Sequence, residues 1–152
     1  MSREIKFRAW NKVWGMMSLV DKIEFEKGKP VSVSVTIKAT DFDHTDEWSD
    51  YEVGDDIILQ QFTGLKDKNG KEIYEGDIIT FTEIDEDSCM GKEDTYTGKV
   101  EWIDEISQWR FIYPSGRRTE LHFIVQLPTI KSCEVIGNIY ENPELLQGLK
   151  DI

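Results

Sequence analysis

The run from residue 61 to residue 79, QFTGLKDKNGKEIYEGDII, alternates short stretches of turn-forming residues with short stretches of strand-forming residues. Its glycines, Gly64, Gly70 and Gly76, recur at a constant interval. Glycine adopts positive φ angles without a clash from a Cβ atom, so this spacing indicates tight turns. A chain built in this way is constrained to a β fold with closely spaced reversals.

The centre of this run predicts a β-hairpin. Asn69 and Gly70 form the pair that two-residue hairpin turns prefer when both central residues need positive φ. We therefore expect residues 62–66 and 71–74 to pair across this turn, and we expect a further strand over residues 77–84.

Alternation of apolar and polar residues predicts most of the other strands, because it is the period of a strand with one buried face. The clearest example is VSVSVTI at residues 31–37. Gly28 and Pro30 indicate a hairpin turn before it, and Pro114 and Gly116 indicate another turn. The remaining expected strands are residues 5–10, 22–27, 98–103, 108–113, 120–125 and 134–140, and residues 57–62 fit either a strand or a helical turn.

Two other segments complete the expected order of elements. Residues 85–95 are rich in acids and contain Gly91, which predicts a mobile loop. Asn142 and Pro143 predict a short C-terminal helix, with Asn at the N-cap and Pro at the first helical position.

Short strands at roughly ten-residue spacing favour a small barrel or a sandwich. We expect a mainly β chain: a hairpin-rich N-terminal part over residues 1–56 and a small SH3-like barrel over residues 57–152. The boundary rests on residues 41–56, which hold eight Asp or Glu and no Lys or Arg. A solvated loop or linker is the favoured interpretation of that segment, because like charges in a row repel and resist packing. The alternative is a docking surface for a basic partner.

Three blocks of the sequence, once the strands are placed, match one known pattern: REIKFRAWN at residues 3–11, QFTGL to YEGDII within residues 61–79, and EVIGNIYENP at residues 134–143. Together they resemble the YopX family of small phage and prophage proteins. The resemblance spans nearly the whole chain. It implies a C-terminal domain similar to an SH3-type barrel and an origin in a phage or prophage, and it implies no established activity and no catalytic residues.

Composition limits the setting in which the protein acts. The formal net charge of −12 argues against a protein whose whole surface binds phosphates. Two cysteines, Cys89 and Cys133, cannot make a disulfide framework, which favours a reducing compartment. No apolar stretch approaches the ~20 residues of a membrane span, and the N-terminus lacks the apolar part of a secretion signal. We expect a cytoplasmic location in the bacterial host and no membrane association.

The sequence partly matches three chemical motifs and fits none of them in full. Residues 41–52 place oxygen ligands as a calcium-binding loop does, but Asp46 stands where that loop needs glycine. Residues 64–71 resemble a phosphate-binding loop, but the glycines are too far apart and Glu72 replaces the required Ser or Thr. Histidines and cysteines are too few and too scattered for a zinc site or a Cys–His pair. We expect no catalytic, metal or cofactor site.

The leading hypothesis is therefore a non-enzymatic protein-interaction module with an unidentified protein partner. Its contact surface would be either the acidic segment or the aromatic side of the barrel. The alternative is nucleic-acid binding through a local basic face, and a metal-dependent hydrolase or nuclease is a third hypothesis. Exposed β edges leave homo-oligomers open. The expected interaction residues are Trp102, Trp109, Arg110, Phe111 and Tyr113, and the expected basic face comprises Lys66, Lys68, Lys71, Arg110, Arg117 and Arg118.

Overall fold

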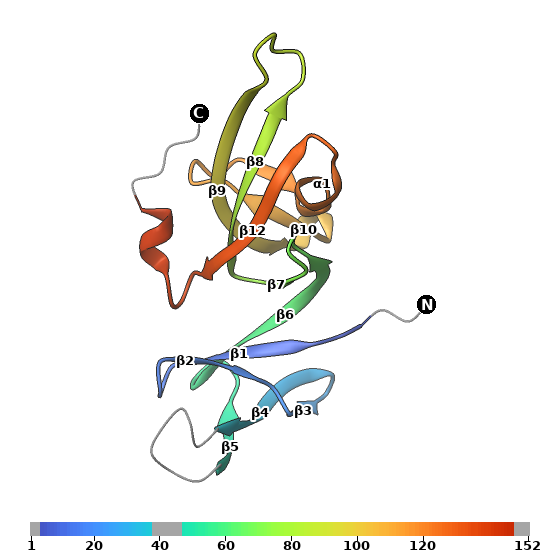
Figure 1. Cartoon of the computed structure of the whole chain (residues 1–152). Helices are drawn as coiled ribbons and strands as arrows, with labels where there is room; N and C mark the ends of the chain where they lie inside the picture. Colours follow the sequence, from blue (N-terminus) through green and yellow to red (C-terminus); the bar gives the residue numbers. More distant parts are fainter. Residues whose placement is uncertain (1–3, 38–46, 148–152) are drawn as a thin grey trace. The chain divides into compact units, whose positions relative to one another are not determined.

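The computed structural model describes residues 4–37 and 47–147. The chain divides into two compact units, Ile5–Gln61 and a unit that begins at Phe62. Antiparallel strands dominate both units. The expected mainly β chain is confirmed: hairpins come first, a barrel-like sheet follows, and a short helix closes the described part (Figure 1).

The N-terminal unit is built from two small antiparallel sheets. In one, β1 lies between β2 and β6, and in the other, β4 lies between β3 and β5. Ala9 and Ile57 from the first sheet and Val33 and Val35 from the second form a buried cluster. The strands are β1 (Phe7–Asn11), β2 (Met16–Leu19), β3 (Lys22–Glu26), β4 (Lys29–Ile37), β5 (Glu47–Glu52) and β6 (Ile57–Lys66).

The expected β3–β4 hairpin is present, but its turn is shorter than expected and begins one residue earlier, since Lys29 and Pro30 belong to β4. Glu26 pairs with Lys29, so the loop consists of Lys27 and Gly28 alone. Both have positive φ angles, 50° and 80° respectively. This is the backbone of a turn whose twist matches the strands that it joins.

Strand β6 runs across the division between the units. Its residues from Ile57 to Gln61 pair with β1, whereas Phe62 and Lys66 pair with β7 (Glu72–Tyr74). Of the two interpretations of residues 57–62, the strand is the one that the structure shows. The units divide after Gln61, five residues beyond the boundary expected at residue 56.

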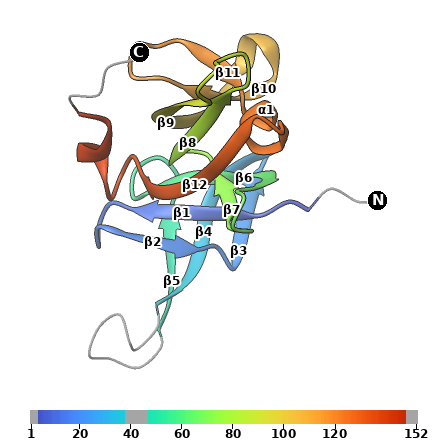
Figure 2. The same cartoon turned by 45° about the horizontal axis from the view of Figure 1, so that its top comes forward.

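The C-terminal unit contains a curled five-stranded antiparallel sheet with the order β11-β10-β9-β8-β12. A short helix, α1, follows β11 and contacts β10 and β12 (Figure 2). No helix among the described residues is long and apolar enough to span a membrane. The elements are β8 (Asp77–Asp85), β9 (Lys92–Ile103), η1 (Asp104–Ile106), β10 (Gln108–Ile112), β11 (Arg118–Glu120), α1 (Leu121–Gln126), β12 (Ile130–Asn138) and the 3-10 helix η2 (Pro143–Leu146).

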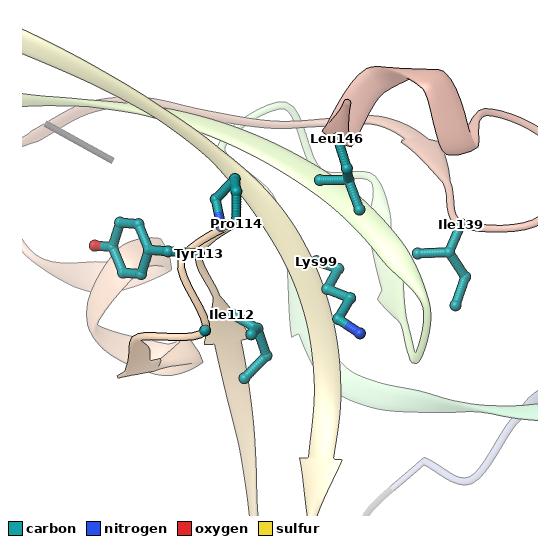
Figure 3. Close-up of a pocket in the computed structure, with 7 residues that line it drawn as sticks. Lys99, Ile112, Tyr113, Pro114, Ile139 and Leu146 are labelled. Carbon is teal, nitrogen blue, oxygen red and sulfur yellow. The ribbon is translucent and has the colours of Figure 1, made fainter. Parts of the chain in front are cut away.

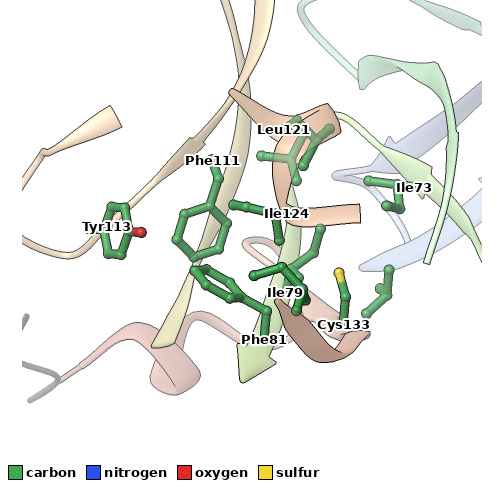
Figure 4. Close-up of a cluster of buried hydrophobic side chains, with 11 residues drawn as sticks. Ile73, Ile79, Phe81, Phe111, Tyr113, Leu121, Ile124 and Cys133 are labelled. Atoms are coloured by element: carbon green, nitrogen blue, oxygen red, sulfur yellow. The ribbon is translucent and has the colours of Figure 1, made fainter. Parts of the chain in front are cut away.

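Aromatic rings fill the hollow of this sheet (Figure 4). Phe81 and Phe111 meet edge to face with ring centroids 5.2 Å apart, and Tyr113 lies 4.8 Å from Phe111. Leu121 and Ile124 of α1 are buried in the same cluster. Edge-to-face pairs of this kind add about 0.5–1.5 kcal/mol to the energy of burial alone.

Helix α1 corrects the strand expected over residues 120–125. Leu121, Phe123 and Val125 alternate as strand residues do, but Leu121 and Ile124 are buried and Phe123 is 43% exposed. Burial at positions i and i+3 is the helical pattern. A run of six residues is too short for periodicity to distinguish the two structures.

The loop expected over residues 85–95 is also shorter than predicted. Strand β8 continues to Asp85 and β9 begins at Lys92, so the connection is residues 86–91. Thr82 and Thr95 face each other across the strands with their hydroxyl oxygens 2.9 Å apart. Cross-strand pairs of this kind stabilise a ladder even where acidic residues lower strand propensity.

The hairpin between β6 and β7 is present, but its turn differs from the one expected. Gly70 has a φ of 85°, whereas Asn69 does not adopt positive φ. The Gly70 amide donates to the Asp67 carbonyl (3.0 Å), and the Asp67 amide donates to the Lys71 carbonyl (2.8 Å). This is a three-residue loop in which glycine forms a bulge after a standard turn. A loop of this type needs only one residue with positive φ. The Asp67 side chain stabilises it further by accepting hydrogen bonds from the Asn69 and Lys71 amides.

Candidate functional site

Trp102 and Trp109 lie directly opposite each other on β9 and β10. Their rings meet edge to face with centroids 5.0 Å apart. Trp102 is 36% exposed, while Trp109 is half-buried against the aromatic core. These two side chains form the most exposed part of the predicted interaction set.

Phe111 and Tyr113 are core residues and do not contribute an exposed surface. Their exposed fractions are 0% and 6%. Ile106 is not among the expected interaction residues, and it is 45% exposed in the turn that joins β9 to β10. We call Trp102 and Trp109 the aromatic patch. The signal that could have identified Ile106 is an apolar residue in a short turn between two tryptophans of the sequence.

Arg110 belongs to an ionic arrangement on the other face of β10, because neighbouring strand residues point to opposite faces. Its guanidinium lies 3.7 Å from a Glu120 carboxylate oxygen, and His122 Nδ1 lies 3.4 Å from the other oxygen of that carboxylate. The Arg110 Nε atom is buried without a hydrogen-bond partner. Arg110 is therefore largely committed to its own sheet.

The basic residues expected to form one face lie on two different hairpins. Lys66, Lys68 and Lys71 are exposed on the β6–β7 hairpin. Arg117 and Arg118 lie at the turn and strand that follow β10, and the Arg117 guanidinium stacks 4.0 Å above the Tyr113 ring. A cation held over an aromatic ring has part of its charge engaged within the protein.

A pocket of about 440 Å³ lies in the C-terminal unit between β9, the end of β10 and η2 (Figure 3). Ile112, Pro114, Ile139 and Leu146 give it an apolar lining. The charged residue in the lining is Lys99, whose amine lies 3.1 Å from a Glu101 carboxylate oxygen. The pocket can accept an apolar group, but it offers no acid and base pair for chemistry.

A second hollow, of about 430 Å³, lies at the far end of the β8–β9 hairpin, which extends beyond the rest of its sheet in Figure 1. Its lining includes five acidic side chains: Glu83, Asp85, Glu86, Asp87 and Asp94. Within residues 4–37 and 47–147 no three His, Cys, Asp or Glu side chains are arranged to hold a metal ion. Half of the loop considered for calcium, residues 41–46 of 41–52, lies outside the described part of the chain.

Asp67, which lies between the two parts of the central block of the family resemblance, supports the backbone. Its Oδ1 atom accepts hydrogen bonds from the amides of Asn69 and Lys71, both at 2.9 Å, and its Oδ2 atom accepts one from the Val135 amide at 3.0 Å. The side chain is buried. This carboxylate is therefore occupied in holding a turn and binding that turn to β12.

The C-terminal block has an equivalent arrangement built on two asparagines. Asn138 Oδ1 accepts from the amides of Tyr140 and Glu141, and Asn142 Oδ1 accepts from the Asn138 amide. A Cβ atom at Gly137 would lie 2.4 Å from Asn142 Oδ1, so glycine is needed for this close approach. The Asn142 side chain thus supports the end of β12. The sequence predicts Asn142 as the side-chain cap of the last helix, but its side chain makes no capping hydrogen bond to η2.

The cysteines differ sharply in environment. Cys89 is exposed in the β8–β9 connection, and Cys133 is buried on β12. Burial, reinforced by the nearby Asp67 carboxylate, raises the pKa of the Cys133 thiol to about 12. A thiol of that kind is protonated at neutral pH and is a poor nucleophile.

Comparison with known proteins agrees with the fold. The sequence matches the family described as YopX protein over residues 6–147. The structure is similar to the crystal structure of protein EF1440 from Enterococcus faecalis, with a TM-score of 0.56, 25% identity, and coverage of 96% of this chain and 100% of that chain. No protein with a curated description matches.

Proposed function

Because this chain belongs to the YopX protein family, we propose that it is a non-enzymatic protein-interaction module, encoded by a phage or prophage and acting in the cytoplasm of the host bacterium. The observation that carries the proposal is the aromatic patch. Tryptophan is enriched among the residues that dominate binding energy at protein interfaces. Trp102 is exposed on a rigid strand and braced by Trp109, so little conformational entropy is lost when a partner covers it.

The use of the buried polar side chains supports a non-enzymatic role. Asp67 and Asn138 are buried and accept hydrogen bonds from backbone amides. Cys133 is held protonated by burial. A catalytic group needs its reactive atom turned toward a substrate with a pKa suited to proton transfer or attack. These side chains are instead committed to the fold.

Nucleic-acid binding is the second candidate function, carried by the three exposed lysines of the β6–β7 hairpin. Phosphate contacts by Lys and Arg give an affinity that falls steeply with salt. A net charge of −12 works against it, since long-range repulsion opposes the approach of a polyanion. A gel shift at low salt tests it, and unchanged mobility of single- and double-stranded DNA and RNA contradicts it.

The proposal is tested by affinity purification from host cells with tagged wild-type protein and with a Trp102→Ala variant. We expect a protein that the wild type retains and the variant loses. Met90→Ala is the matched control, because Met90 is 92% exposed at the end of another hairpin. If Trp102→Ala recovers the same partner as the wild type and Met90→Ala, the aromatic patch is not the contact surface. Repeated failure to recover any partner, with a monomer by light scattering, would contradict the module itself.

A further inference from the structure

We infer that the N-terminal unit carries a separate docking surface, centred on Trp14 and Tyr51, that binds an arginine- or lysine-rich segment of a partner protein. Trp14 is in the turn between β1 and β2, and Tyr51 is on β5. The inference rests on the proposed function only in that both require a protein partner. The residues involved all belong to the unit Ile5–Gln61, whereas the aromatic patch belongs to the other unit.

Trp14 is exposed but held in place. Its indole Nε1 donates a 2.7 Å hydrogen bond to the Tyr51 hydroxyl, and its backbone amide donates to Asn11 Oδ1 at 3.1 Å. The neighbouring Val13 amide donates to the same oxygen at 2.9 Å. Trp14 is nevertheless 51% exposed and Val13 59% exposed. A large apolar surface that is already ordered loses little entropy when it is covered.

The same turn is bound to the acidic connection between β5 and β6. The Lys12 amide donates to the Asp56 carbonyl at 2.8 Å, and Lys12 Nζ donates to the Gly54 carbonyl at 2.6 Å. The Glu52 amide and the Asp56 carboxylate close that connection at 3.3 Å. The tryptophan and the acidic connection are therefore parts of one hydrogen-bonded surface.

The charges on this surface specify the occupant. The acidic connection between β5 and β6 supplies two acids, Asp55 and Asp56, and the β1–β2 turn supplies one cation, Lys12. Asp50 and Glu52 flank Tyr51 on β5, so they point to the opposite face of that strand, where Asp50 accepts a hydrogen bond from the Ser34 hydroxyl. Lys12 directs its amine to a carbonyl within the surface. An indole face attracts a guanidinium or ammonium group, most strongly that of arginine. Carboxylates near the indole can pair with the same guanidinium or ammonium groups. Val13 offers apolar contact to the aliphatic part of an arginine or lysine side chain.

This combination selects against the other classes of partner. A nucleic acid or an acidic peptide would meet the Asp55 and Asp56 carboxylates and be repelled. A purely apolar segment would remove water from those carboxylates without giving them a hydrogen-bond or charge partner, which costs free energy. A cationic segment satisfies the aromatic and the acidic parts together.

The test uses the full chain labelled with ¹⁵N and tetra-arginine amide as the probe, at about 0.15 M salt so that attraction beyond roughly 8 Å is screened. Each tryptophan indole gives its own NMR signal, and the signal that Trp14→Ala removes belongs to Trp14. We expect a saturable shift of the Trp14 indole and of the Asp55 amide, with the Trp102 indole unmoved. Tetra-glutamate amide should move none of them.

Variants separate a specific site from general attraction to an acidic protein. Asp55→Asn and Trp14→Ala should each weaken binding about three-fold, the effect of one exposed cation–aromatic contact or one nearby charge. Trp102→Ala should leave binding unchanged, and its effect on partner capture tests the proposed function independently. Shifts spread over all acidic surfaces, or equal affinity of Trp14→Ala and wild type with both melting normally, would overturn the inference.

Discussion

Asp67 shows how one side chain supports two elements. Its three hydrogen bonds to backbone amides hold the β6–β7 turn and join it to the outer edge of β12, where the Lys68 amide also donates to the Cys133 carbonyl at 3.0 Å. We expect Asp67→Ala to lower the free energy of unfolding by about 3 kcal/mol, because hydrogen bonds to a charged acceptor contribute about 1.5–3 kcal/mol and the Val135 amide would be left buried.

Urea denaturation measures this loss. Asp67→Asn should lie between the alanine variant and wild type, since the amide keeps one acceptor oxygen. Asp85→Ala is the matched control, because Asp85 accepts from the Asp87 amide in an exposed turn and should cost less than about 1 kcal/mol. Equal losses for Asp67→Ala and Asp85→Ala would contradict the role given to Asp67.

The two thiols should react at very different rates. Cys89 is exposed, whereas burial raises the pKa of Cys133 to about 12. At pH 8 we expect a thiol reagent to modify Cys89 quickly and Cys133 only when the protein is unfolded, because the thiolate is the reacting form. Cys89→Ser should abolish the fast reaction. Fast modification of Cys133 in the folded Cys89→Ser variant would contradict its burial.

The same shift predicts a dependence of stability on pH. An unfolded Cys133 ionises near 9, so the thiol favours the folded state fully below that pH, and this contribution is lost as pH rises toward about 12. We expect the free energy of unfolding of Cys89→Ser to fall more steeply above pH 9 than that of Cys89→Ser combined with Cys133→Val. Parallel curves for the two variants would show that Cys133 ionises alike in both states.

At the scale of the elements, the sequence predicts strands well where alternation is long and turns well where glycine is required. The strand over residues 31–37 and the turn at Gly28 are confirmed as β4 and its hairpin. Helix α1 was missed because six apolar-rich residues fit both periods, and only packing of Leu121 and Ile124 into the sheet decides between them.

Gly98 lies where β9 closely approaches the end of β10. A Cβ atom there would lie 2.3 Å from the Ile112 carbonyl oxygen and 2.6 Å from the Phe111 ring. We expect Gly98→Ala to destabilise the protein by about 1–3 kcal/mol or more, because the obstructing oxygen belongs to the backbone and the strand must shift. Thr95→Ala, an exposed position on the same strand, should change stability by less than about 1 kcal/mol in the same thermal melt. A Gly98→Ala variant as stable as wild type would mean that β9 and β10 are spaced more widely than described.

At the scale of the whole molecule, the sequence predicts the family and the fold class because both depend on residues that shape the backbone. The three blocks that carry the resemblance contain Asn11, Asp77 and Asn138, and each accepts a hydrogen bond from a backbone amide. The interaction residues were harder to predict. Burial of Phe111 is decided by which face of a curled sheet it occupies, and that depends on pairings between distant segments.

The two units have cores of different size, which predicts different local stability. Among the residues that the structure describes, eleven buried side chains form the core cluster of the C-terminal unit, whereas four form that of the N-terminal unit. We expect amide hydrogens of β4 to exchange with solvent faster than those of β8 and β9, because a segment with fewer buried apolar contacts opens at lower free energy. Val33→Ala should accelerate exchange in β4 and leave β8 unchanged, while Ile79→Ala should do the opposite. Acceleration of both units by either substitution would show that they open as one cooperative structure.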